Sequence, residues 1–396
     1  MSNNGSKLKF IDIFAGAGGL SHGLEMAGLE CILGVEKDKF AAETFRLNHK
    51  KAAIFDADIE MLTESKLLSL LNGNKVDVVV GGPPCQGFST VGLGNPKDKR
   101  NFLFKEFIRI VKITQPKFFV IENVTGILAK KNEKTIQAIV HFFNQMGYQL
   151  DIQVMSADHF GVPERRRRTI FLGSRINASI TFPKAIFNTN IKTNRGEQFI
   201  PPVTVGDALK DLCDEKGKIH NHDLDLAQIK NELDLKRLKY IPEGKGIRYE
   251  KDEVKYLPKK LRYGIDWEKL PEGRFRQMKY QRLDRNSVSP TIMTHRQNYY
   301  HPTEHRYLTQ REAAALQSFP NHFIFKGPMS SQWRQIGNAV PPLLGKAIGR
   351  AILQMYRESN LVQKNQLKKN QLQRIKKNEV GQKRSKAFNY KKELAL

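Results

Sequence analysis

Cysteine is scarce in this sequence, and the scarcity excludes two classes of site. The chain of 396 residues holds only Cys31, Cys85 and Cys213. None of these has the paired spacing of a disulfide framework or of a zinc site. We therefore expect a protein of a reducing, cytoplasmic setting that holds no metal ion.

Long apolar runs are also missing. No run approaches the roughly 18 apolar residues of a membrane span, and the opening MSNNGSKLKF lacks the hydrophobic region of a signal peptide. With 40% apolar and 27% charged residues, the composition is typical of a soluble globular protein. We expect no membrane attachment, and the length predicts roughly two to three domains.

Acidic residues are few beside the basic ones. The chain has 66 Lys and Arg against 40 Asp and Glu, a formal net charge of +26, which makes a polyanion the first partner to consider. The segment 357–396 alone holds about 12 basic and 3 acidic residues. That segment is either a solvated basic tail or a nucleic-acid contact. On charge alone, membranes and acidic proteins stay open as partners.

Short β-rich runs alternate with stretches suited to helices from Lys9 to about Arg175. Such alternation is typical of parallel strands joined by helical crossovers, and it predicts an α/β fold with a doubly wound sheet. The expected strands are Lys9–Phe14, Cys31–Glu36, Val76–Val80, Phe118–Ile121 and Thr169–Leu172. The expected helices are Gly19–Ala27, Phe40–Asn48, Phe102–Thr114 and Glu133–Met146.

A second region follows the alternating one. After about Pro183 the sequence becomes polar and Lys-rich with scattered prolines, until order returns near Tyr307. The chain has neither an internal repeat nor a Gly/Ser linker. We therefore expect a rigid body of two lobes with the functional site in the cleft between them.

A glycine-rich turn, IDIFAGAGGL at Ile11–Leu20, comes directly after the first expected strand and before a helix. Backbone NH groups and the helix dipole favour a polar ligand there, and Gly16 and Gly18 permit its close approach. Glu36 closes the second strand near the spacing at which an acid meets ribose hydroxyls. Taken one at a time, the glycines are equally consistent with a tight turn, and Glu36 with an ordinary surface residue. Asp58, in FDADIE, is equally consistent with a turn former. Their order predicts a nucleoside-bearing cofactor.

Cys85 lies in DVVVGGPPCQGFS at Asp77–Ser89, where a strand of the buried type runs into Gly-Gly-Pro-Pro. Prolines stiffen the loop beyond the strand end, and glycines and prolines are unsuited to a core strand. An isolated cysteine is commonly a small buried hydrophobe. This context favours a nucleophile instead.

Together these segments resemble the DNA cytosine-5 methyltransferase family of the prokaryotic restriction-modification type. FAGAGG, PPCQGFS and ENV are followed, in the family's order, by ERRRR at Glu164–Arg168, RYLTQREAAALQSFP at Arg306–Pro320 and QIGNAVPP at Gln335–Pro342. The resemblance leaves mainly about Phe182–Tyr300 unmatched. Glu164 departs from the glutamine that usually begins its motif.

The resemblance implies a Rossmann-like methyltransferase sheet with a smaller target-recognition domain. It implies methyl transfer from S-adenosylmethionine, with S-adenosylhomocysteine as product, to a cytosine flipped out of double-stranded DNA. Cys85 would add to C6 of the base, and Glu122 would act as the acid at N3. Arg166 and Arg168 would contact the base carbonyl and the phosphates, with Arg168 at the base. The cofactor residues it implies are Phe14, Gly16 and Gly18 in the loop, Glu36 at ribose, Asp58 and Ile59 at adenine, and Asn338.

The resemblance also divides the chain. Because the family's last motif belongs beside the first strand, the helix expected around Leu343–Tyr356 packs back onto the large domain. The expected parts are a catalytic and cofactor-binding domain at 1–200, a target-recognition domain at 201–325, a return to the catalytic domain at 326–356, and a basic tail at 357–396. We expect a monomer on DNA, in the cytoplasm at the nucleoid. A functional pairing with a restriction endonuclease stays open, as does the target sequence.

Three other functions compete with this interpretation. A sequence-specific DNA-binding regulator without catalysis would suit the charge, but Cys85 and Glu122 are intact. An RNA cytosine methyltransferase is disfavoured by the long segment before RYLTQRE and by the single cysteine-bearing catalytic motif. A nicotinamide dehydrogenase fits least, because the Gly-X-Gly-X-X-Gly spacing is not met and PPCQGFS has no role in hydride transfer.

We predict that Cys85→Ala abolishes methyl transfer and leaves DNA binding largely intact, because it removes the nucleophile without changing the charge of the chain. Counting labelled methyl groups in DNA, beside a DNA-binding titration of the same variant, measures both quantities. Unchanged turnover would remove Cys85 from the mechanism.

Overall fold

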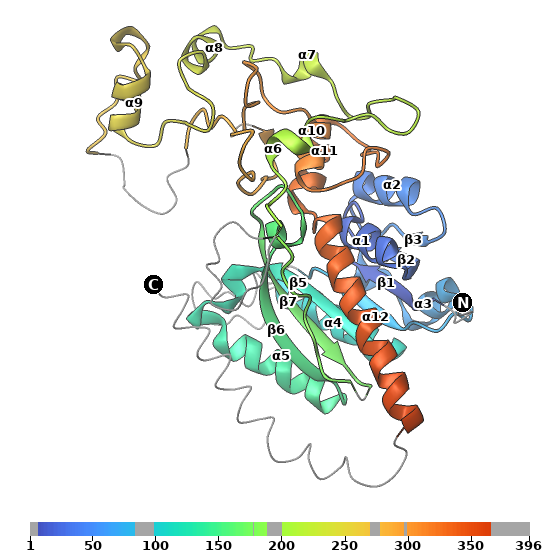
Figure 1. Ribbon diagram of the computed structural model, residues 1–396. Helices are drawn as coiled ribbons and strands as arrows, with labels where there is room; N and C mark the ends of the chain where they lie inside the picture. Colours follow the sequence, from blue (N-terminus) through green and yellow to red (C-terminus); the bar gives the residue numbers. More distant parts are fainter. Residues whose placement is uncertain are drawn as a thin grey trace.

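A seven-stranded sheet forms the centre of the larger lobe. The structure, a computed structural model, describes residues 7–83, 99–176, 178–187, 200–269, 278–296 and 299–365, with the backbone alone at 99–102, 131 and 361–365. Within these ranges the strand order is β3-β2-β1-β4-β5-β7-β6 (Figure 1). The strands are β1 (Lys9–Ile13), β2 (Glu30–Val35), β3 (Ala53–Phe55), β4 (Val78–Gly81), β5 (Phe118–Val124), β6 (Gln149–Ser156) and β7 (Arg167–Ser174).

The strands from β1 to β5 are parallel, and β7 is not. Neighbours among the first five pair in parallel, as the sequence predicts, whereas β7 lies antiparallel between β5 and β6. The expectation of parallel strands is therefore wrong for β7, and β3 and β6 were not expected. The cause is the connection 157–166, which contains only the single turn η4 (Ala157–Phe160). A parallel crossover needs a dozen or more residues.

Both faces of the sheet are apolar, and helices cover each face. The helices of this lobe are α1 (Gly19–Ala27), α2 (Lys39–Asn48), α3 (Glu64–Leu71), α4 (Lys99–Thr114), α5 (Glu133–Gln145) and α12 (Pro342–Asn365). Val78 and Val80 of β4 join the apolar cluster under α1 and α12, while Val79 joins the cluster under α3, α4 and α5. Burial of both faces is what a doubly wound sheet requires. The predicted fold class is confirmed; α3 was not expected.

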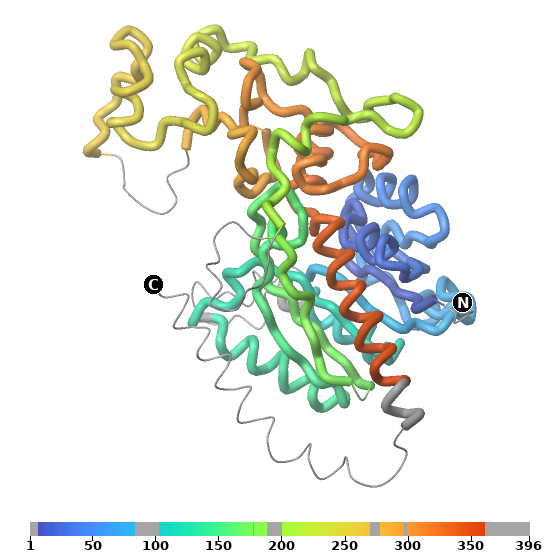
Figure 2. The backbone as a smooth tube through the Cα atoms, in the orientation of Figure 1, coloured from blue at the N-terminus to red at the C-terminus, as the bar shows by residue number. Residues whose placement is uncertain are grey.

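The last helix, α12, returns to the N-terminal half of the chain and lies along α1 (Figure 2). Glycine lets the two backbones touch: a Cβ at Gly23 would lie 2.2 Å from the carbonyl oxygen of Pro342 and 2.7 Å from Cα of Gly345. Leu344 and Ile348 thereby reach the apolar cluster of the first face. The helix expected around Leu343–Tyr356 is present and packs on the larger lobe. The domain boundaries expected from the resemblance stay a prediction.

The smaller lobe is built from short helices and isolated β-bridges between residues 200 and 340. Its helices are α6 (Val205–Ala208), α7 (Leu224–Ala227), α8 (Glu232–Leu238), α9 (Glu250–Tyr256), α10 (Gln310–Leu316) and α11 (Met329–Asn338). One apolar cluster surrounds Trp333 and Phe323 and includes Ala17 of the larger lobe. A second contains Tyr280 and Tyr300. No helix in the described ranges is both long enough and apolar enough to cross a membrane.

The charged residues of RYLTQREAAALQSFP serve the folding of this lobe. Thr309 and Glu312 form a capping box at the start of α10, with hydrogen bonds of 3.2 Å and 2.8 Å. Arg306 pairs with the same Glu312 carboxylate at 2.8 Å. The buried Arg311 donates to the carbonyl oxygen of Phe323 at 3.0 Å. Each of these contacts gives a buried polar group a hydrogen-bond partner.

We predict that Gly23→Ala lowers the free energy of unfolding by about 1–3 kcal/mol, the usual cost of overpacking. The added methyl group would meet backbone atoms of α12 that cannot rotate away. Chemical denaturation measures the change. Gly126→Ala is the matched control, because a Cβ there has nothing within 4 Å; an equal loss in both variants would contradict the packing.

Candidate functional site

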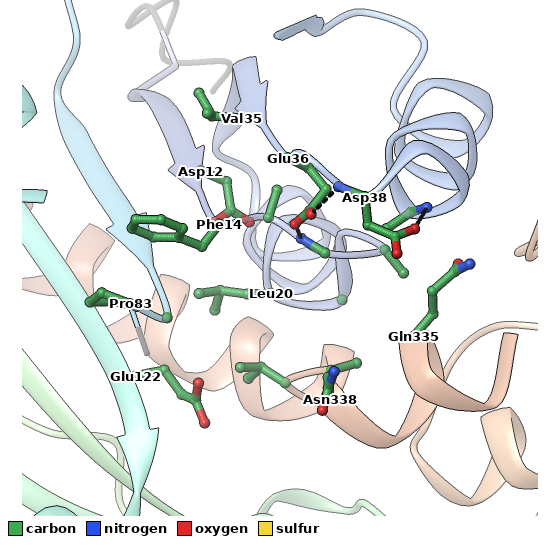
Figure 3. A pocket seen from close by; sticks show the side chains of 18 of the residues that line it. Asp12, Phe14, Leu20, Val35, Glu36, Asp38, Pro83, Glu122, Gln335 and Asn338 are labelled. Atoms are coloured by element: carbon green, nitrogen blue, oxygen red, sulfur yellow. Dashed lines mark hydrogen bonds between the residues drawn. The ribbon is translucent and has the colours of Figure 1, made fainter. Parts of the chain in front are cut away.

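A cavity of about 490 Å³ opens at the carboxyl ends of β1, β2, β4 and β5 (Figure 3). Its walls come from the loop after β1, the ends of β2 and β5, and the end of α11. It therefore lies where the two lobes meet, at the edge where doubly wound sheets bind ligands. The expected site residues that line it are Phe14, Gly16, Glu36, Asp58, Ile59, Glu122, Arg168 and Asn338.

The loop after β1 turns through left-handed backbone conformations. The φ angle is 65° at Phe14, 56° at Gly16 and 90° at Gly18. The two glycines adopt such values without strain, whereas a positive φ is uncommon for a residue with a Cβ such as Phe14. Gly18 is not a lining residue: it is the N-cap of α1, and a Cβ there would lie 2.2 Å from Nε2 of His49. Phe14 both lines the cavity and packs against the apolar cluster of the second face.

Glu36 ties this loop to the second strand. One carboxylate oxygen accepts a hydrogen bond from the backbone NH of Gly16 at 2.8 Å, and the other accepts from the NH of Asp38 at 2.8 Å. Burial raises the pKa of Glu36, and these donors lower it in part. The carboxylate is thus held at a fixed place on the cavity wall.

Two ion pairs lie at the rim of the cavity. Nζ of Lys37 lies 3.2 Å from Asp58, and Arg334 lies 3.4 Å from Asp38. All four side chains are more than a third exposed, so each pair contributes little to stability. Asp58 and the buried Ile59 were expected here; Lys37 and Arg334 were not, because a surface cation carries no signal in the sequence.

Glu122 and Arg168 form an ion pair inside the cavity. Nε of Arg168 lies 2.7 Å from Oε1 of Glu122, and each side chain is 13% exposed. The antiparallel register of β5 and β7 sets the contact, because Arg168 stands opposite Val124, two residues from Glu122. Burial raises the pKa of Glu122 despite the opposing charges of Arg168 and Arg166. A buried acid of this kind is suited to proton transfer or donation.

Asn123 anchors the loop that follows β4. Its Nδ2 donates to the carbonyl oxygen of Pro83 at 3.0 Å, and its Oδ1 accepts from the NH of Val124 at 2.9 Å. Gly82 and Pro83 line the cavity. Cys85, two residues further along the sequence, lies outside the described residues.

Arg166 is buried behind the cavity and does not line it. Its guanidinium lies 3.5 Å from the Glu164 carboxylate and donates to the carbonyl oxygens of Ile292 at 3.2 Å and Gly337 at 2.5 Å. Glu164 in turn accepts from the NH of Ile292 at 2.6 Å. Arg166, one residue before β7, therefore links the start of that strand to the smaller lobe and to Gly337 in α11. Gly337 directly precedes Asn338. The expected contact of Arg166 with a base stays a prediction.

Asp12, the residue before the last one of β1, also lines the cavity, without having been expected there. It is 2% exposed, and its carboxylate accepts a hydrogen bond from the hydroxyl of Ser21 at 2.6 Å. Burial raises the pKa of Asp12 to about 7. The available signal was an acid inside the apolar run FIDIF. Among side chains in the described ranges, no group of three His, Cys, Asp or Glu is placed to hold a metal ion.

Comparisons with known proteins agree with this arrangement. The model of the C-5 cytosine-specific DNA methylase family matches residues 8–354. The chain is 38% identical over 355 residues to the Type II methyltransferase M1.HphI of Haemophilus parahaemolyticus, covering 88% of this chain and 87% of that protein. It is 33% identical over 387 residues to M.DdeI of Desulfomicrobium norvegicum, covering 90% and 91%.

Solved structures share the fold. One, described as a DNA modification methyltransferase encoded within a prophage of E. coli, aligns with a TM-score of 0.66 and 26% identity over 89% of this chain and 100% of that chain. The S. pombe Dnmt2 methyltransferase aligns with a TM-score of 0.55 and 16% identity over 89% and 100%. The fold is that of S-adenosylmethionine-dependent methyltransferases.

We predict that Arg166→Met lowers the free energy of unfolding by about 3–5 kcal/mol, because the Glu164 carboxylate stays buried without its cation. Adding Glu164→Gln should recover part of the loss, since an amide needs no counter-charge. Denaturation of the two single variants and the double variant measures the coupling. Arg167→Ala, at an exposed arginine of the same run, is the control. Strictly additive losses would contradict the pairing.

Proposed function

Since this chain belongs to the C-5 cytosine-specific DNA methylase family, we propose that it transfers a methyl group from S-adenosylmethionine to C5 of a flipped cytosine in a specific double-stranded DNA sequence. The enzyme class, DNA (cytosine-5-)-methyltransferase, follows from the family. The observation that carries the finer proposal is the cavity, in which Glu36 and the Glu122–Arg168 pair meet at one edge of the sheet.

The cavity fits S-adenosylmethionine in size and in the chemistry of its walls. Its volume of about 490 Å³ lies in the range of small-molecule sites. Glu36, fixed by two backbone NH groups, would accept from the ribose hydroxyls. Asp58 would accept from the adenine amino group, and Ile59 would pack on the ring. When bound, the cofactor supplies a methyl carbon on a positively charged sulfur. The remaining residues assigned to this pocket are Phe14, Gly16 and Asn338, which line it, whereas Gly18 caps α1 beside the loop and does not reach the cavity.

Cys85 is the proposed nucleophile, because cytosine C5 reacts poorly until another group adds to C6. The Cys85 thiolate would form a bond to C6 and push an electron pair to C5. C5 would then bond to the methyl carbon while the methyl–sulfur bond breaks, and the electron pair of that bond would stay on sulfur in neutral S-adenosylhomocysteine. Loss of the C5 proton to water and expulsion of the thiolate restore the aromatic ring. The residues just before Cys85 support this role: a Cβ at Gly82 would lie 2.9 Å from the Glu122 carboxylate.

Glu122 is the proposed acid at N3 of the base, and Arg168 the proposed donor to the base carbonyl. The two side chains pair with each other at 2.7 Å. An entering cytosine would exchange that contact for two new ones, with N3 facing Glu122 and O2 facing Arg168. The raised pKa of Glu122 favours the protonated acid that addition at C6 requires.

The smaller lobe is the proposed reader of the DNA sequence. A cytosine must leave the helix stack to reach the cavity, at a cost of a few kcal/mol that other DNA contacts offset. Contacts from 201–325 would supply sequence specificity, and the net charge of +26 would attract the phosphates. Arg166, which links this lobe to the cavity wall, would couple the two tasks.

The biological role we propose is protection of DNA from an endonuclease that recognises the same sequence. Several relatives carry the name Type II methyltransferase, which supports a restriction-modification setting. We propose that the protein acts as a monomer on DNA in the cytoplasm. Methylation of one short motif would then block cleavage there.

Transfer of labelled methyl groups from S-adenosylmethionine to DNA, followed by bisulfite sequencing, tests the proposed function. The expected result is methylcytosine confined to one short motif. A folded protein that binds the cofactor but labels no DNA of varied sequence would overturn the proposal. Labelling of RNA alone would move the substrate to RNA.

We predict that Glu122→Gln slows methyl transfer by about 100-fold or more, the usual contribution of a general acid. Because the pKa of Glu122 is raised and the protonated form is the active one, the wild-type rate should fall as pH rises through that pKa. The variant should lose this dependence.

Single-turnover rates across pH measure both effects. Glu106→Gln is the control, because the Glu106 side chain is 9% exposed and pairs with Arg109 at 2.5 Å but does not line the cavity. Wild-type rates in Glu122→Gln would exclude the N3 role.

A further inference from the structure

The smaller lobe lies on α2 along a seam that no short motif of the sequence connects. Phe40, Thr44 and Asn48 are spaced four residues apart, so they lie on one face of that helix. This face meets the segment 324–327 of the smaller lobe. At one end of the seam, a Cβ at Gly327 would lie 2.5 Å from the Phe40 ring, so the backbone approaches the ring more closely than a side chain would allow.

Two polar side chains of α2 hold the backbone of this segment. Asn48 binds Ile324 twice: its Nδ2 donates to the carbonyl oxygen at 2.9 Å, and its Oδ1 accepts from the NH at 3.0 Å. The hydroxyl of Thr44, a fully buried residue, accepts from the NH of Lys326 at 2.8 Å. The seam is therefore a set of specific hydrogen bonds between the lobes.

Thr44 also connects the seam to the wall of the cavity. Its hydroxyl donates to Oε1 of Gln335 at 2.7 Å, and Nε2 of Gln335 donates to the carbonyl oxygen of Lys326 at 2.9 Å. Both ends of the Gln335 amide are thus fixed. Gln335 and Asn338, which follows it by three residues in α11, line the cavity on the side opposite Glu36 (Figure 3).

The cavity therefore has walls from both lobes, and the seam holds the two walls together. The larger lobe carries Glu36, and α11 of the smaller lobe carries Gln335 and Asn338. Loss of the Thr44 hydroxyl would remove two hydrogen bonds at once. Resting on the proposed function, we infer that Thr44 and Asn48 are positioning residues of the cofactor site, which they complete by holding the α11 wall against the Glu36 wall.

The seam and Arg166 hold α11 at different places. Arg166 binds the carbonyl oxygen of Gly337, and it precedes by two residues the arginine that pairs with Glu122. The seam instead holds Gln335 from α2, the helix that follows Glu36 in the chain. We therefore expect the seam to govern the affinity for the cofactor and to have little effect on methyl transfer once the cofactor is bound.

Calorimetric titration of the full chain with S-adenosylmethionine and with S-adenosylhomocysteine, without DNA, measures the affinity. Thr44→Val removes the hydroxyl and keeps the shape of the side chain. We expect both dissociation constants to rise about tenfold, the effect of one lost hydrogen bond. Single-turnover methyl transfer at saturating cofactor should stay within about twofold of the wild-type rate, because no group that touches the reacting atoms changes. Thr44→Ser, which keeps the hydroxyl, should restore the affinity.

Asn48→Ala tests the seam at a second point and serves if Thr44→Val does not fold. It should weaken the binding of both ligands. Asn221→Gly is the matched control, because Asn221 holds the adjacent Phe325 by the same pair of bonds, at 2.8 and 2.9 Å, within the smaller lobe. Glycine adopts the φ angle of 56° at that position without strain. Denaturation should show both variants less stable, with the affinity lowered in Asn48→Ala alone.

Unchanged affinity in a folded Thr44→Val would overturn the inference. An equal loss of affinity in Asn48→Ala and Asn221→Gly would also overturn it, because general destabilisation would then explain both. A slower reaction at saturating cofactor, with unchanged affinity, would count against it in the same way. A wild-type protein that folds and binds neither ligand would instead refute the proposed function.

Discussion

The buried guanidinium of Arg166 is the interaction on which the geometry of the site depends. A charge in the interior requires partners, and losing one costs several kcal/mol. Those partners are Glu164 beside it, Ile292 in the smaller lobe and Gly337 in α11, the last two separated from it by 126 and 171 positions in the sequence. If the two lobes moved apart, this charge would be exposed to solvent or would lose its hydrogen-bond partners. The bond to Gly337 also holds the next residue, Asn338, at the cavity wall.

The same requirement for partners shapes the cavity itself. Arg168, in β7, follows Arg166 by two residues and pairs with Glu122, which keeps both groups in place until a base can replace the contact. At the other end, Glu36 is satisfied by backbone NH groups that also fix the glycine-rich loop. Asp12 lines the cavity as well. A chain with a net charge of +26 thus presents an acidic cavity.

Much of the larger lobe could be predicted from the sequence, because local patterns determine it. The turn Ile11–Leu20, the strand that carries Glu122 and the helix Gly19–Ala27 all follow from residue order and periodicity. The reversed direction of β7 could not be predicted from strand propensity, since it depends on the length of the connection from β6. The strand pattern predicted a strand at Thr169–Leu172, inside the observed Arg167–Ser174, and said nothing of its neighbours.

The sequence predicted which residues lie at the site better than it predicted which contacts they make there. Glu122, Glu36 and Asn338 were expected at the cavity and line it. The partners of Arg166 lie in segments that no short motif connects, and the run of four arginines gave no sign that one is fully buried while Arg165 is 55% exposed. Asp12 was passed over because an acid in a strand contributes nothing to a hydrophobic pattern.

The central claim is that the sulfur of Cys85 bonds to C6 of the target cytosine, and trapping that bond tests it most directly. On DNA whose target cytosines carry fluorine at C5, no proton can leave C5 after methyl transfer, so the bond to the enzyme persists. The expected result is a complex that survives denaturation, forms only with S-adenosylmethionine, and yields a DNA-linked peptide containing Cys85 by mass spectrometry. Attachment at another residue, or no attachment by a protein that methylates unmodified DNA, would contradict the account.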